Sequence, residues 1–448
     1  MFLSPVESVK SFVRSLVCPA HILVAVSGGS DSIGLLIALH SVLSDNSFRA
    51  IKFSAISVDH GIRDEAKDEV KYVFDICSRL GIPHAVVVWK DQKPKTGLMA
   101  AARKARYALI FDYAMKIGAT LVVTAHTFDD QLETVYMRSQ RDYAEKGMGL
   151  SGISETVLYD MRLWIARPFL CCRREDIRSF LLQRNIGWCE DPSNADDRFE
   201  RVRVRRLIQD IDPHKMYRKI EKFRNLRIAV NNNVATLIPQ YLKVHWQSVI
   251  ALSEDVLNID LILLSYLLKV SIAICGGKTS FPGYRSMERV IAYLKNQKKG
   301  CISIGRVVID RRVNFLWITR AVRDLPTVKL HLKETAVWDG RYRFTNSSNE
   351  SIRIGAKVYN KEMGFSSGMP SIVAQRAFSS LPSEEGGEPV IAPFSRFITI
   401  FDLPVAHAIS ISFDTVFIPQ SPFCYEKKNI FIDFIELLLL SSRFGLDH

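Results

Sequence analysis

The stretch HILVAVSGGSDSIGLL, residues 21–36, decides the fold that we expect for this chain. Its first six residues are mostly apolar and typical of a buried strand, and residues 32–43 have the composition of a helix. Gly28 and Gly29, between these segments, allow the backbone to approach an anion closely, and the N–H groups of the turn and of the helix N-terminus point towards it. The stretch therefore predicts a phosphate-binding turn between a strand and a helix.

The same order of a short apolar strand followed by a helix repeats along the N-terminal part of the chain. We expect further strands at 53–58, 85–89 and 120–124, and helices at 64–80, 98–117 and 129–138. Strands that alternate with helices in this way form parallel sheets with helices on both faces. The sequence therefore predicts an α/β fold with a doubly wound, Rossmann-like parallel sheet.

The length of the chain and the change in its sequence pattern along the chain indicate three domains. A chain of 448 residues exceeds what one hydrophobic core usually organises. Longer helical stretches with basic faces appear at 215–238 and 256–275, and short strand-like runs return at 301–319. The three expected domains are a catalytic α/β domain over residues 1–212, a mainly helical domain over 213–322 and a small mixed C-terminal domain over 323–448.

Composition favours a polyanionic partner and a reducing compartment. The 60 Lys and Arg residues exceed the 47 Asp and Glu residues, and the net charge of +13 attracts polyanions such as nucleic acid. The alternative, that the excess charge is scattered and only aids solubility, stays open at this point. The eight cysteines show no C-x-x-C spacing, which argues against a zinc site, an iron–sulfur cluster or a disulfide scaffold and favours reduced thiols in the cytoplasm.

The sequence also predicts that no membrane is involved. The N-terminal residues lack the uninterrupted apolar core of an export signal. The apolar run at 430–440 is interrupted by Asp433 and Glu436 and is too short to cross a bilayer. The sequence does not decide whether the apolar residues of this run pack against a second copy of the chain in a homodimer.

The turn after the first strand supplies the candidate nucleotide-binding residues. Its backbone N–H groups and serine hydroxyls would bind phosphate oxygens, and the Asp31 carboxylate is placed to ligate a Mg²⁺ ion that bridges these oxygens. A Gly-Gly turn without a ligand is the simpler alternative. The full set of candidates is Ser27, Gly28, Gly29, Ser30, Asp31 and Ser32.

A second group of polar residues follows the fourth expected strand, in the segment AHTFDDQLET. His126, Asp130 and Glu133 are spaced by four and three residues, which places them on one face at a helix N-terminus. Asp130 and Glu133 are candidate Mg²⁺ ligands and catalytic residues beside Asp31, and His126 is a candidate proton carrier or hydrogen-bond donor. The simpler alternatives are N-capping by one of Asp129 and Asp130, and a buried structural histidine.

Arginines close to these segments are candidate phosphate contacts. Arg103 and Arg106 lie on the expected helix at 98–117, and Arg106 is also a catalytic candidate. Five arginines fall within the nine residues 198–206, where only one acid accompanies them, so we expect contacts with nucleic acid or ATP phosphates. A solvated helix face is the alternative for both groups. The binding candidates of the dense cluster are Arg201, Arg203 and Arg205.

Further basic residues lie in the expected middle domain and would bind nucleic acid away from the chemistry. They are Lys215, Arg218, Lys219, Lys222, Arg224, Arg227, Lys295, Lys298 and Lys299.

The string S-G-G-x-D-S after the first strand resembles the loop of the N-type ATP pyrophosphatases, the PP-loop superfamily, which split ATP between its α and β phosphates. Together with DHGIR at 59–63, RPFL at 167–170 and WCEDPSN at 188–194, it makes the chain similar to the tRNA(Ile)-lysidine synthetase family over roughly the first 210 residues. Three positions depart from that family. Thr127 replaces a second histidine, RSQRDY at 138–143 replaces an Arg-Gly-Ser-Gly stretch, and Val202 replaces an asparagine.

This resemblance implies an ATP-dependent reaction on the wobble cytidine of tRNA(Ile) with a CAU anticodon. In the family, the cytidine O2 attacks the α-phosphate of ATP, and the ε-amine of free lysine then displaces AMP at C2. Lysidine is formed, and the codon that the tRNA reads changes from AUG to AUA. The implied cofactors are ATP and Mg²⁺, and the implied partners are this tRNA and lysine.

Other functions stay open from the sequence. A PP-loop tRNA thiolase would also need ATP and a basic surface, but such enzymes use paired cysteines or an iron–sulfur cluster, and only Cys171 and Cys172 are adjacent here. A non-catalytic tRNA-binding protein with a vestigial nucleotide fold is a second alternative. The intact loop at 27–32 argues against it.

Overall fold

The structure is a computed structural model, and it describes residues 2–62, 66–140, 148–190, 198, 200–296, 299–359, 368–415 and 418–424. Several residues named in the sequence analysis are not among those that the structure describes. Arg63, the apolar run 430–440, Lys298, residues 141–143 of the RSQRDY segment and residues 191–194 of the WCEDPSN segment lie outside the described residues.

The chain divides into two units, which are described separately. Unit 1 comprises Met1–Arg224 and Pro419–His448, and unit 2 comprises Asn225–Ile418. All candidate catalytic and nucleotide-binding residues belong to unit 1.

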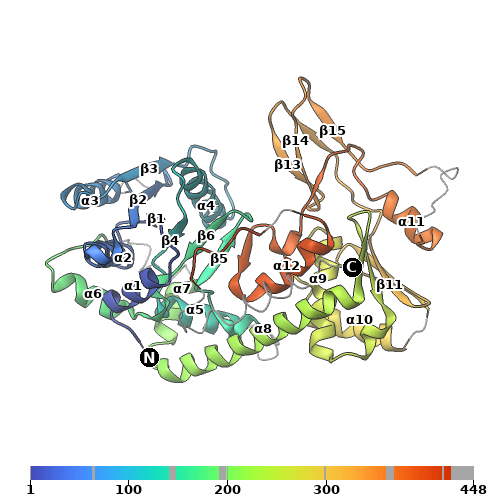
Figure 1. Cartoon of the computed structure of the whole chain (residues 1–448), viewed down its shortest axis with the longest axis horizontal. Coiled ribbons are helices and arrows are strands. Elements are labelled where there is room, and N and C mark those ends of the chain that lie inside the picture. The colour runs from blue at the N-terminus through green and yellow to red at the C-terminus, as the bar shows by residue number, and fades with distance from the viewer. Residues whose placement is uncertain are drawn as a thin grey trace. The chain divides into compact units, whose positions relative to one another are not determined.

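Six strands of unit 1 lie in one sheet in the order β5-β6-β4-β1-β2-β3 (Figure 1). Neighbouring strands are parallel, except that β5 and β6 are antiparallel. The order of the strands reverses between β1 and β4, and open α/β sheets bind ligands at such a switch point, beyond the carboxyl ends of the strands. The strands are β1 (Ala20–Ala25), β2 (Ile51–Asp59), β3 (His84–Val88), β4 (Leu121–Val123), β5 (Thr156–Tyr159) and β6 (Leu163–Ala166).

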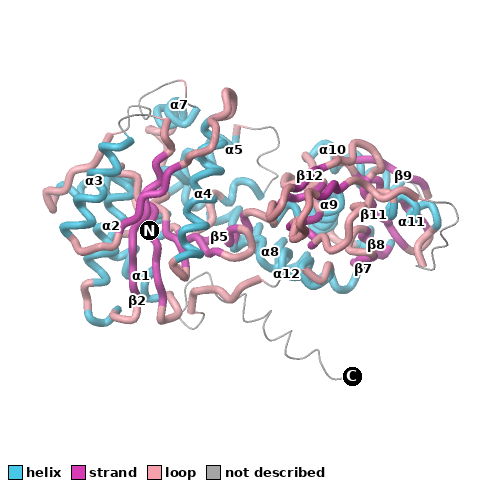
Figure 2. Tube along the Cα trace, turned by 90° about the horizontal axis from the view of Figure 1, so that it is seen from above, coloured by secondary structure: helices cyan, strands magenta, loops and turns pink. Residues whose placement is uncertain are grey.

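Helices cover both faces of this sheet, which confirms the predicted doubly wound α/β fold. Helices α2 and α3 lie on one face and α4 on the other, and Figure 2 shows the strands between these helices. α2 is mostly apolar and buried, since α1 and α6 pack against it. The helices are α1 (Pro5–Arg14), α2 (Ser30–Leu43), α3 (Ala66–Arg79), α4 (Leu98–Lys116), α5 (Phe128–Ser139), α6 (Arg174–Leu182) and α7 (Glu200–Leu207).

The long helix α8 (Pro213–Tyr241) begins in unit 1 and ends in unit 2, whose main sheet is antiparallel. This sheet has the strand order β7-β8-β11-β10-β9, and α8, α9 and α10 supply the helical part of the region 213–322. The apolar helix α9 is buried beside the sheet. The elements of this part are β7 (Leu242–His245), β8 (Val249–Ser253), α9 (Leu261–Cys275), α10 (Tyr284–Asn296), β9 (Gly300–Ile304), β10 (Val307–Arg312) and β11 (Phe315–Arg320).

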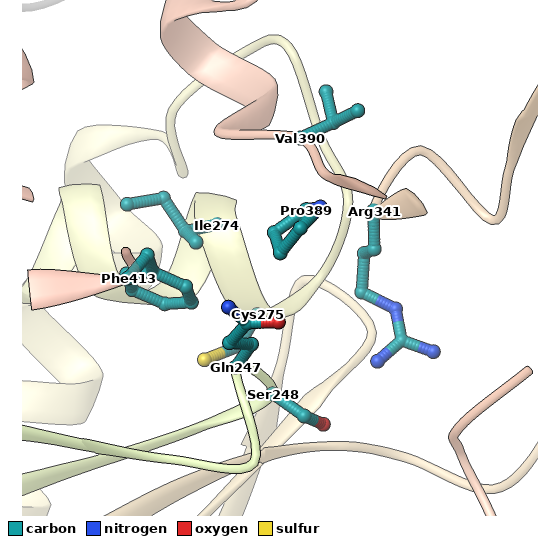
Figure 3. A pocket seen from close by; sticks show the side chains of 8 residues that line it. All are labelled: Gln247, Ser248, Ile274, Cys275, Arg341, Pro389, Val390 and Phe413. Atoms are coloured by element: carbon teal, nitrogen blue, oxygen red, sulfur yellow. The ribbon is translucent and has the colours of Figure 1, made fainter. Parts of the chain in front are cut away.

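The rest of unit 2 mixes short strands with helices. Its elements are β12 (Val328–Leu330), β13 (Thr335–Trp338), β14 (Tyr342–Thr345), β15 (Ile352–Ile354), α11 (Ser371–Phe378), β16 (Glu388–Pro389), β17 (Phe397–Thr399) and α12 (Leu403–Ser412). Here Asp339 is fully buried and pairs with three arginines, Arg306, Arg320 and Arg341. Figure 3 shows Arg341 and Ser248 on the wall of a small cavity beside this cluster. Within the described ranges every helix is too short or too polar to traverse a lipid bilayer.

Candidate active site

The loop between β1 and α2 is shaped by hydrogen bonds among its own residues. The Ser32 hydroxyl accepts from the Ser27 N–H at 3.1 Å and donates to the Gly29 carbonyl at 3.0 Å. Gly28 has a φ of +69°, a left-handed conformation that favours glycine. Gly29 is the N-cap of α2, and no side chain of the described residues caps this helix. The first N–H groups of α2 are therefore available to an anion.

A segment distant in sequence closes one side of this loop. The Cys189 N–H donates to the Gly28 carbonyl at 2.9 Å. A Cβ atom at position 28 would lie 3.4 Å from the Cys189 Sγ and 3.4 Å from the Glu69 Cβ. The left-handed turn at Gly28 is thus enclosed by α3 and by the chain after α6.

The second loop at the switch point follows β4 and leads into α5. Thr127 is the N-cap of α5: its hydroxyl accepts from the Asp130 N–H at 3.3 Å, and the Asp130 Oδ2 accepts from the Thr127 N–H at 2.8 Å. This capping box fixes the Asp130 carboxylate at the helix N-terminus. Asp129 instead reaches the next helix, because its Oδ2 accepts from the Arg174 N–H at 2.7 Å.

The Arg174 guanidinium joins the two loops. Its Nε lies 3.0 Å from the Asp31 Oδ2. Its Nη2 lies 3.5 Å from the Asp130 Oδ1, and its Nη1 lies 3.6 Å from the Glu133 Oε1. Each nitrogen of one side chain therefore faces a different carboxylate, and the three acids predicted from the sequence converge on this cation.

Two arginines of α7 also lie against these carboxylates, so that three cations face three anions. Arg205 Nε donates to Glu133 Oε1 at 2.6 Å, and Arg201 Nη1 lies 4.0 Å from Asp130 Oδ1. The other oxygen of Glu133, Oε2, is buried and has no hydrogen-bond partner among the described residues. Three carboxylates and three guanidinium groups therefore form one partly buried network.

The predicted residues Arg103, Arg106 and Arg203 have other contacts. Arg106 Nε donates to His60 Nε2 at 3.3 Å, and Arg103 Nη2 donates to the Tyr107 hydroxyl at 3.4 Å. Arg203 donates to the Arg198 carbonyl at 3.1 Å. All three residues are exposed, so a ligand that approaches from solvent can reach them.

Burial shifts the ionisation of the site. It raises the pKa of Asp31 above its usual value, although the cation of Arg174 acts against the shift. Burial acts on Asp130 in the same direction, but His126, Arg174 and the Thr127 N–H outweigh it, and the pKa of Asp130 is lowered. The pKa of Arg174 is raised, because the attraction of its carboxylates exceeds the cost of burial.

His126 is uncharged in this environment. Burial and the nearby cation of Arg167 hold the pKa of His126 well below its usual range. The side chain precedes α5 rather than lying on it, and its Nδ1 is 3.0 Å from the Thr124 hydroxyl. A neutral imidazole here can donate or accept a hydrogen bond with a ligand, but it provides no positive charge to attract one.

The carboxylates do not form a ready-made metal cage. Among the described residues, no three His, Cys, Asp or Glu side chains converge closely enough to hold a metal ion by themselves. The unpartnered Glu133 Oε2 and the oxygen chemistry of Asp31 and Asp130 nevertheless suit a hard cation such as Mg²⁺, which commonly takes only one or two protein carboxylates and completes its shell with phosphate oxygens and water.

Arg174 was not among the residues singled out from the sequence. A local signal for it exists, because cations at a helix N-terminus oppose the helix dipole, and both Arg173 and Arg174 stand at the start of α6. Two arginines in that position indicate that anions lie opposite them. The identity of these anions could not be predicted, because Arg174 and Asp31 are about 140 residues apart in the sequence. A local sequence pattern does not reveal a contact over that separation.

This sheet, with its glycine loop at the switch point, is that of a PP-loop protein, and a model of the PP-loop domain family matches residues 5–211. The tRNA(Ile)-lysidine synthase of Rhizobium meliloti is 34% identical over 442 residues, which cover 93% of this chain and 96% of that relative. The enzyme of the same name from Mesorhizobium japonicum is 34% identical over 428 residues, covering 89% of this chain and 93% of that relative. The chain belongs to the tRNA(Ile)-lysidine synthase family, which confirms the resemblance found in its sequence.

One solved structure to which the chain is weakly similar is that of the U34-tRNA thiolase NcsA from Methanococcus maripaludis. It superposes with a TM-score of 0.41 at 15% sequence identity, and covers 50% of this chain and 78% of that chain. The likeness is too distant to bear on function.

Proposed function

We propose that the chain ligates lysine to C2 of the wobble cytidine of tRNA(Ile) with a CAU anticodon, using ATP. The observation that carries this proposal is the similarity to tRNA(Ile)-lysidine synthases along nearly the whole chain. The uncapped start of α2 at the switch point supports it, because it suits the phosphates of ATP. The product base, lysidine, would change the codon read from AUG to AUA.

The proposed reaction has two steps. In the first, the cytidine O2 forms a bond to the α-phosphorus of ATP, and the bond from this phosphorus to pyrophosphate breaks. Oxygen at C2 is a poor leaving group, and adenylation converts it into a good one. In the second step, the uncharged ε-amine of lysine forms a bond to C2, AMP leaves with the former O2, and the nitrogen loses a proton.

The loop at 27–32 would bind the phosphates of ATP. Backbone N–H groups at the start of α2 and the hydroxyls of Ser27 and Ser30 can donate to phosphate oxygens. Fixed donors of this kind stabilise the charge that develops on the departing pyrophosphate. Asp31, Asp130 and Glu133 would hold one Mg²⁺ together with those phosphates, and the bound ion would supply further neutralisation of charge.

His126 and the arginines would orient the substrates. Because its pKa is so low, His126 is a weak base near neutral pH, and a hydrogen-bonding role suits it better than proton transfer. Arg103, Arg106, Arg201 and Arg203 would contact phosphates of ATP or of the anticodon loop. Arg205 would act on the substrates through Glu133, with which it pairs.

Exposed basic residues on α8 would bind the tRNA away from the chemistry. Lys215, Arg218 and Lys222 are exposed and follow each other at spacings of three and four, so they form one stripe on the helix. Arg224 and Arg227, which we also expected to bind nucleic acid, pair with acids of the protein, Glu155 and Asp402 respectively. The stripe of three is therefore the part of this helix best suited to phosphate contacts.

The proposal is tested by nucleoside analysis of tRNA after incubation with the enzyme, ATP and isotopically labelled lysine. We expect the label in a modified cytidine at the wobble position, and none when ATP is omitted. A thiolated base that needs a sulfur donor would favour the thiolase alternative. An unmodified tRNA, with the enzyme folded and ATP bound, would refute the proposal.

A further inference from the structure

We propose that the small cavity in unit 2 binds a monovalent anion of the halide class, such as chloride, at the guanidinium of Arg341. Arg341 and the other residues that line this cavity all belong to unit 2 (Figure 3). The inference is therefore independent of the reaction proposed for unit 1.

The cavity adjoins a group of charged side chains in which cations outnumber anions. Asp339 is the one carboxylate among the described residues that pairs with Arg306, Arg320 and Arg341. The side chain of Arg306 is 27% exposed, so solvent screens its charge. The side chains of Arg320 and Arg341 are 0% and 4% exposed, and these two cations share the single negative charge of Asp339. Because an uncompensated charge is unfavourable in a protein interior, the group favours the binding of a further anion.

One nitrogen of Arg341 has no acceptor. The Arg341 Nε donates to Asp339 Oδ2 at 2.7 Å, and its Nη2 donates to the Ser380 carbonyl. Its Nη1 is buried and has no hydrogen-bond partner among the described residues. Every nitrogen of Arg320, in contrast, donates to Asp339 or to a backbone carbonyl. A guanidinium group contains only donors, so the Nη1 of Arg341 requires an acceptor from outside the described chain.

The Ser248 hydroxyl is a second polar group on the cavity wall. It is buried and, like Arg341 Nη1, has no hydrogen-bond partner among the described residues. The hydroxyl of Tyr342 is close to it but donates to the Gln247 carbonyl at 3.3 Å. Figure 3 shows the Arg341 guanidinium and the Ser248 hydroxyl on the same side of the cavity. Two donors, one of them charged, are therefore available to one ligand.

The size and the remaining wall of the cavity favour a halide over water or an oxyanion. The cavity has a volume of about 10 Å³, which suits one particle of about the size of a water molecule and excludes phosphate or sulfate. A buried water molecule needs about two to four polar partners and carries no charge to compensate a cation. A halide needs only donors and tolerates contact with apolar side chains. Much of the remaining wall is apolar, with Ile274, Pro389, Val390 and Phe413.

The test is the thermal stability of the full chain in increasing sodium chloride, with sodium gluconate added to keep the ionic strength constant. We expect Tm to rise with the chloride concentration, because a ligand that binds only the folded state stabilises it. Ser248→Ala should raise the apparent Kd for chloride about tenfold, since it removes one hydrogen bond to an ion. A wild-type Tm that is equal in chloride and in gluconate would overturn the inference.

Ser271→Ala is the matched control, because Ser271 is a fully buried serine of α9 whose hydroxyl donates to the Leu267 carbonyl at 2.9 Å. Its response to chloride should equal that of the wild type. A wild-type response in Ser248→Ala would also overturn the inference. If Ser248→Ala does not fold, Ser248→Cys decides, since a thiol is a weaker donor of similar size: an unchanged response to chloride in that variant has the same meaning.

Crystals of the full chain grown in sodium bromide give a direct second measurement. Bromide resembles chloride in size and charge and is located by its anomalous scattering. We expect an anomalous peak within hydrogen-bond distance of the Arg341 Nη1. A water molecule at that place, without anomalous signal, would refute the binding of a halide.

Discussion

Arg205 and Glu133 form the shortest ion pair of the candidate site, with 2.6 Å between Nε and Oε1. The Glu133 side chain is 1% exposed and that of Arg205 is 33% exposed, so the pair joins the buried side of α5 to the partly exposed helix α7. At least one arginine of the dense basic cluster is therefore directed into the protein. Part of the charge of that cluster is therefore balanced by acids of the candidate site.

We expect Glu133→Ala to lower the free energy of unfolding by about 1.5–3 kcal/mol, because it removes the buried carboxylate that accepts from Arg205, while Arg174 keeps Asp31 and Asp130 as partners. Urea unfolding followed by circular dichroism measures the change. The control is Arg178→Ala, which removes a pair with Glu190 that is largely exposed, 43% and 61% for the two side chains, and should cost less than about 1 kcal/mol. Equal losses in the two variants would contradict the buried network.

Gly28→Ala should destabilise the loop by about 1–3 kcal/mol, because alanine disfavours the φ of +69° and its Cβ would meet Cys189 and Glu69 at 3.4 Å. Gly29→Ala should cost less, about 0.5–1 kcal/mol for a poorer N-cap residue, since a Cβ there meets no atom within 4 Å. Its KM for ATP should nevertheless rise, because the added methyl group would occupy space next to the bound phosphates. An unchanged KM for ATP in Gly29→Ala would argue against phosphate binding at this turn.

Asp31→Ala should abolish tRNA-dependent pyrophosphate release, because it removes both a proposed Mg²⁺ ligand and the carboxylate that faces the Arg174 Nε. The assay measures pyrophosphate with tRNA and lysine present. Asp45→Ala is the matched control, since Asp45 is an exposed acid beyond the other end of α2 and accepts its hydrogen bonds from Ser47. Full activity of Asp31→Ala would remove Asp31 from the site.

The stability of the protein should fall as the pH drops below about 6.5, in part because of His126. Burial holds the pKa of His126 in the folded protein well below that of a free histidine, so the unfolded chain binds a proton at a pH where the native protein does not. His126→Asn should therefore reduce the slope of Tm against pH between about pH 6.5 and 5. The slope should not vanish, because the pKa values of His60 and His84 are also lowered by burial. A slope identical to that of the wild type would show that His126 is protonated in the native state.

The affinity for tRNA should fall steeply with salt, and the stripe on α8 should account for part of this slope. Replacing Lys215, Arg218 and Lys222 together by glutamine should flatten the plot of log K against log salt by about one unit for each phosphate that the variant no longer neutralises. Filter binding with labelled tRNA gives the slope. Lys116→Gln is the control, because Lys116 is exposed at the end of α4, at the edge of the sheet opposite to the switch point. A wild-type slope in the triple variant would place the tRNA elsewhere.

The order of strands and helices from β1 to α5 could be predicted from the sequence because each element carries its own period. The strand expected at 53–58 is β2 (Ile51–Asp59), and the helix expected at 98–117 is α4 (Leu98–Lys116). The hairpin of β5 and β6 was not predicted as a pair of strands, since each has only four residues, all of them buried. Runs this short give no alternation from which to distinguish a strand from a helical turn.

The acids of the candidate site were predictable, and so was the nearness of Arg201 and Arg205 to a ligand, but neither Arg174 nor any pairing between these groups was. Asp31, Asp130 and Glu133 stand next to the ends of strands, and parallel strands bring their carboxyl ends to one edge. Arg174 and Arg205 reach this edge from helices far along the chain, and the partner of a charged side chain depends on tertiary packing. The distances between the acids and these guanidinium groups therefore came only from the structure.

The hydrogen bond from the Cys189 N–H to the Gly28 carbonyl bears on the order in which the protein matures. During synthesis, β1 and the glycine turn leave the ribosome about 160 residues before the segment that encloses the turn. A nascent chain that ends before Cys189 can pair its first strands but lacks the hydrogen bond that closes the turn. The turn is therefore completed only after translation has passed the end of α6.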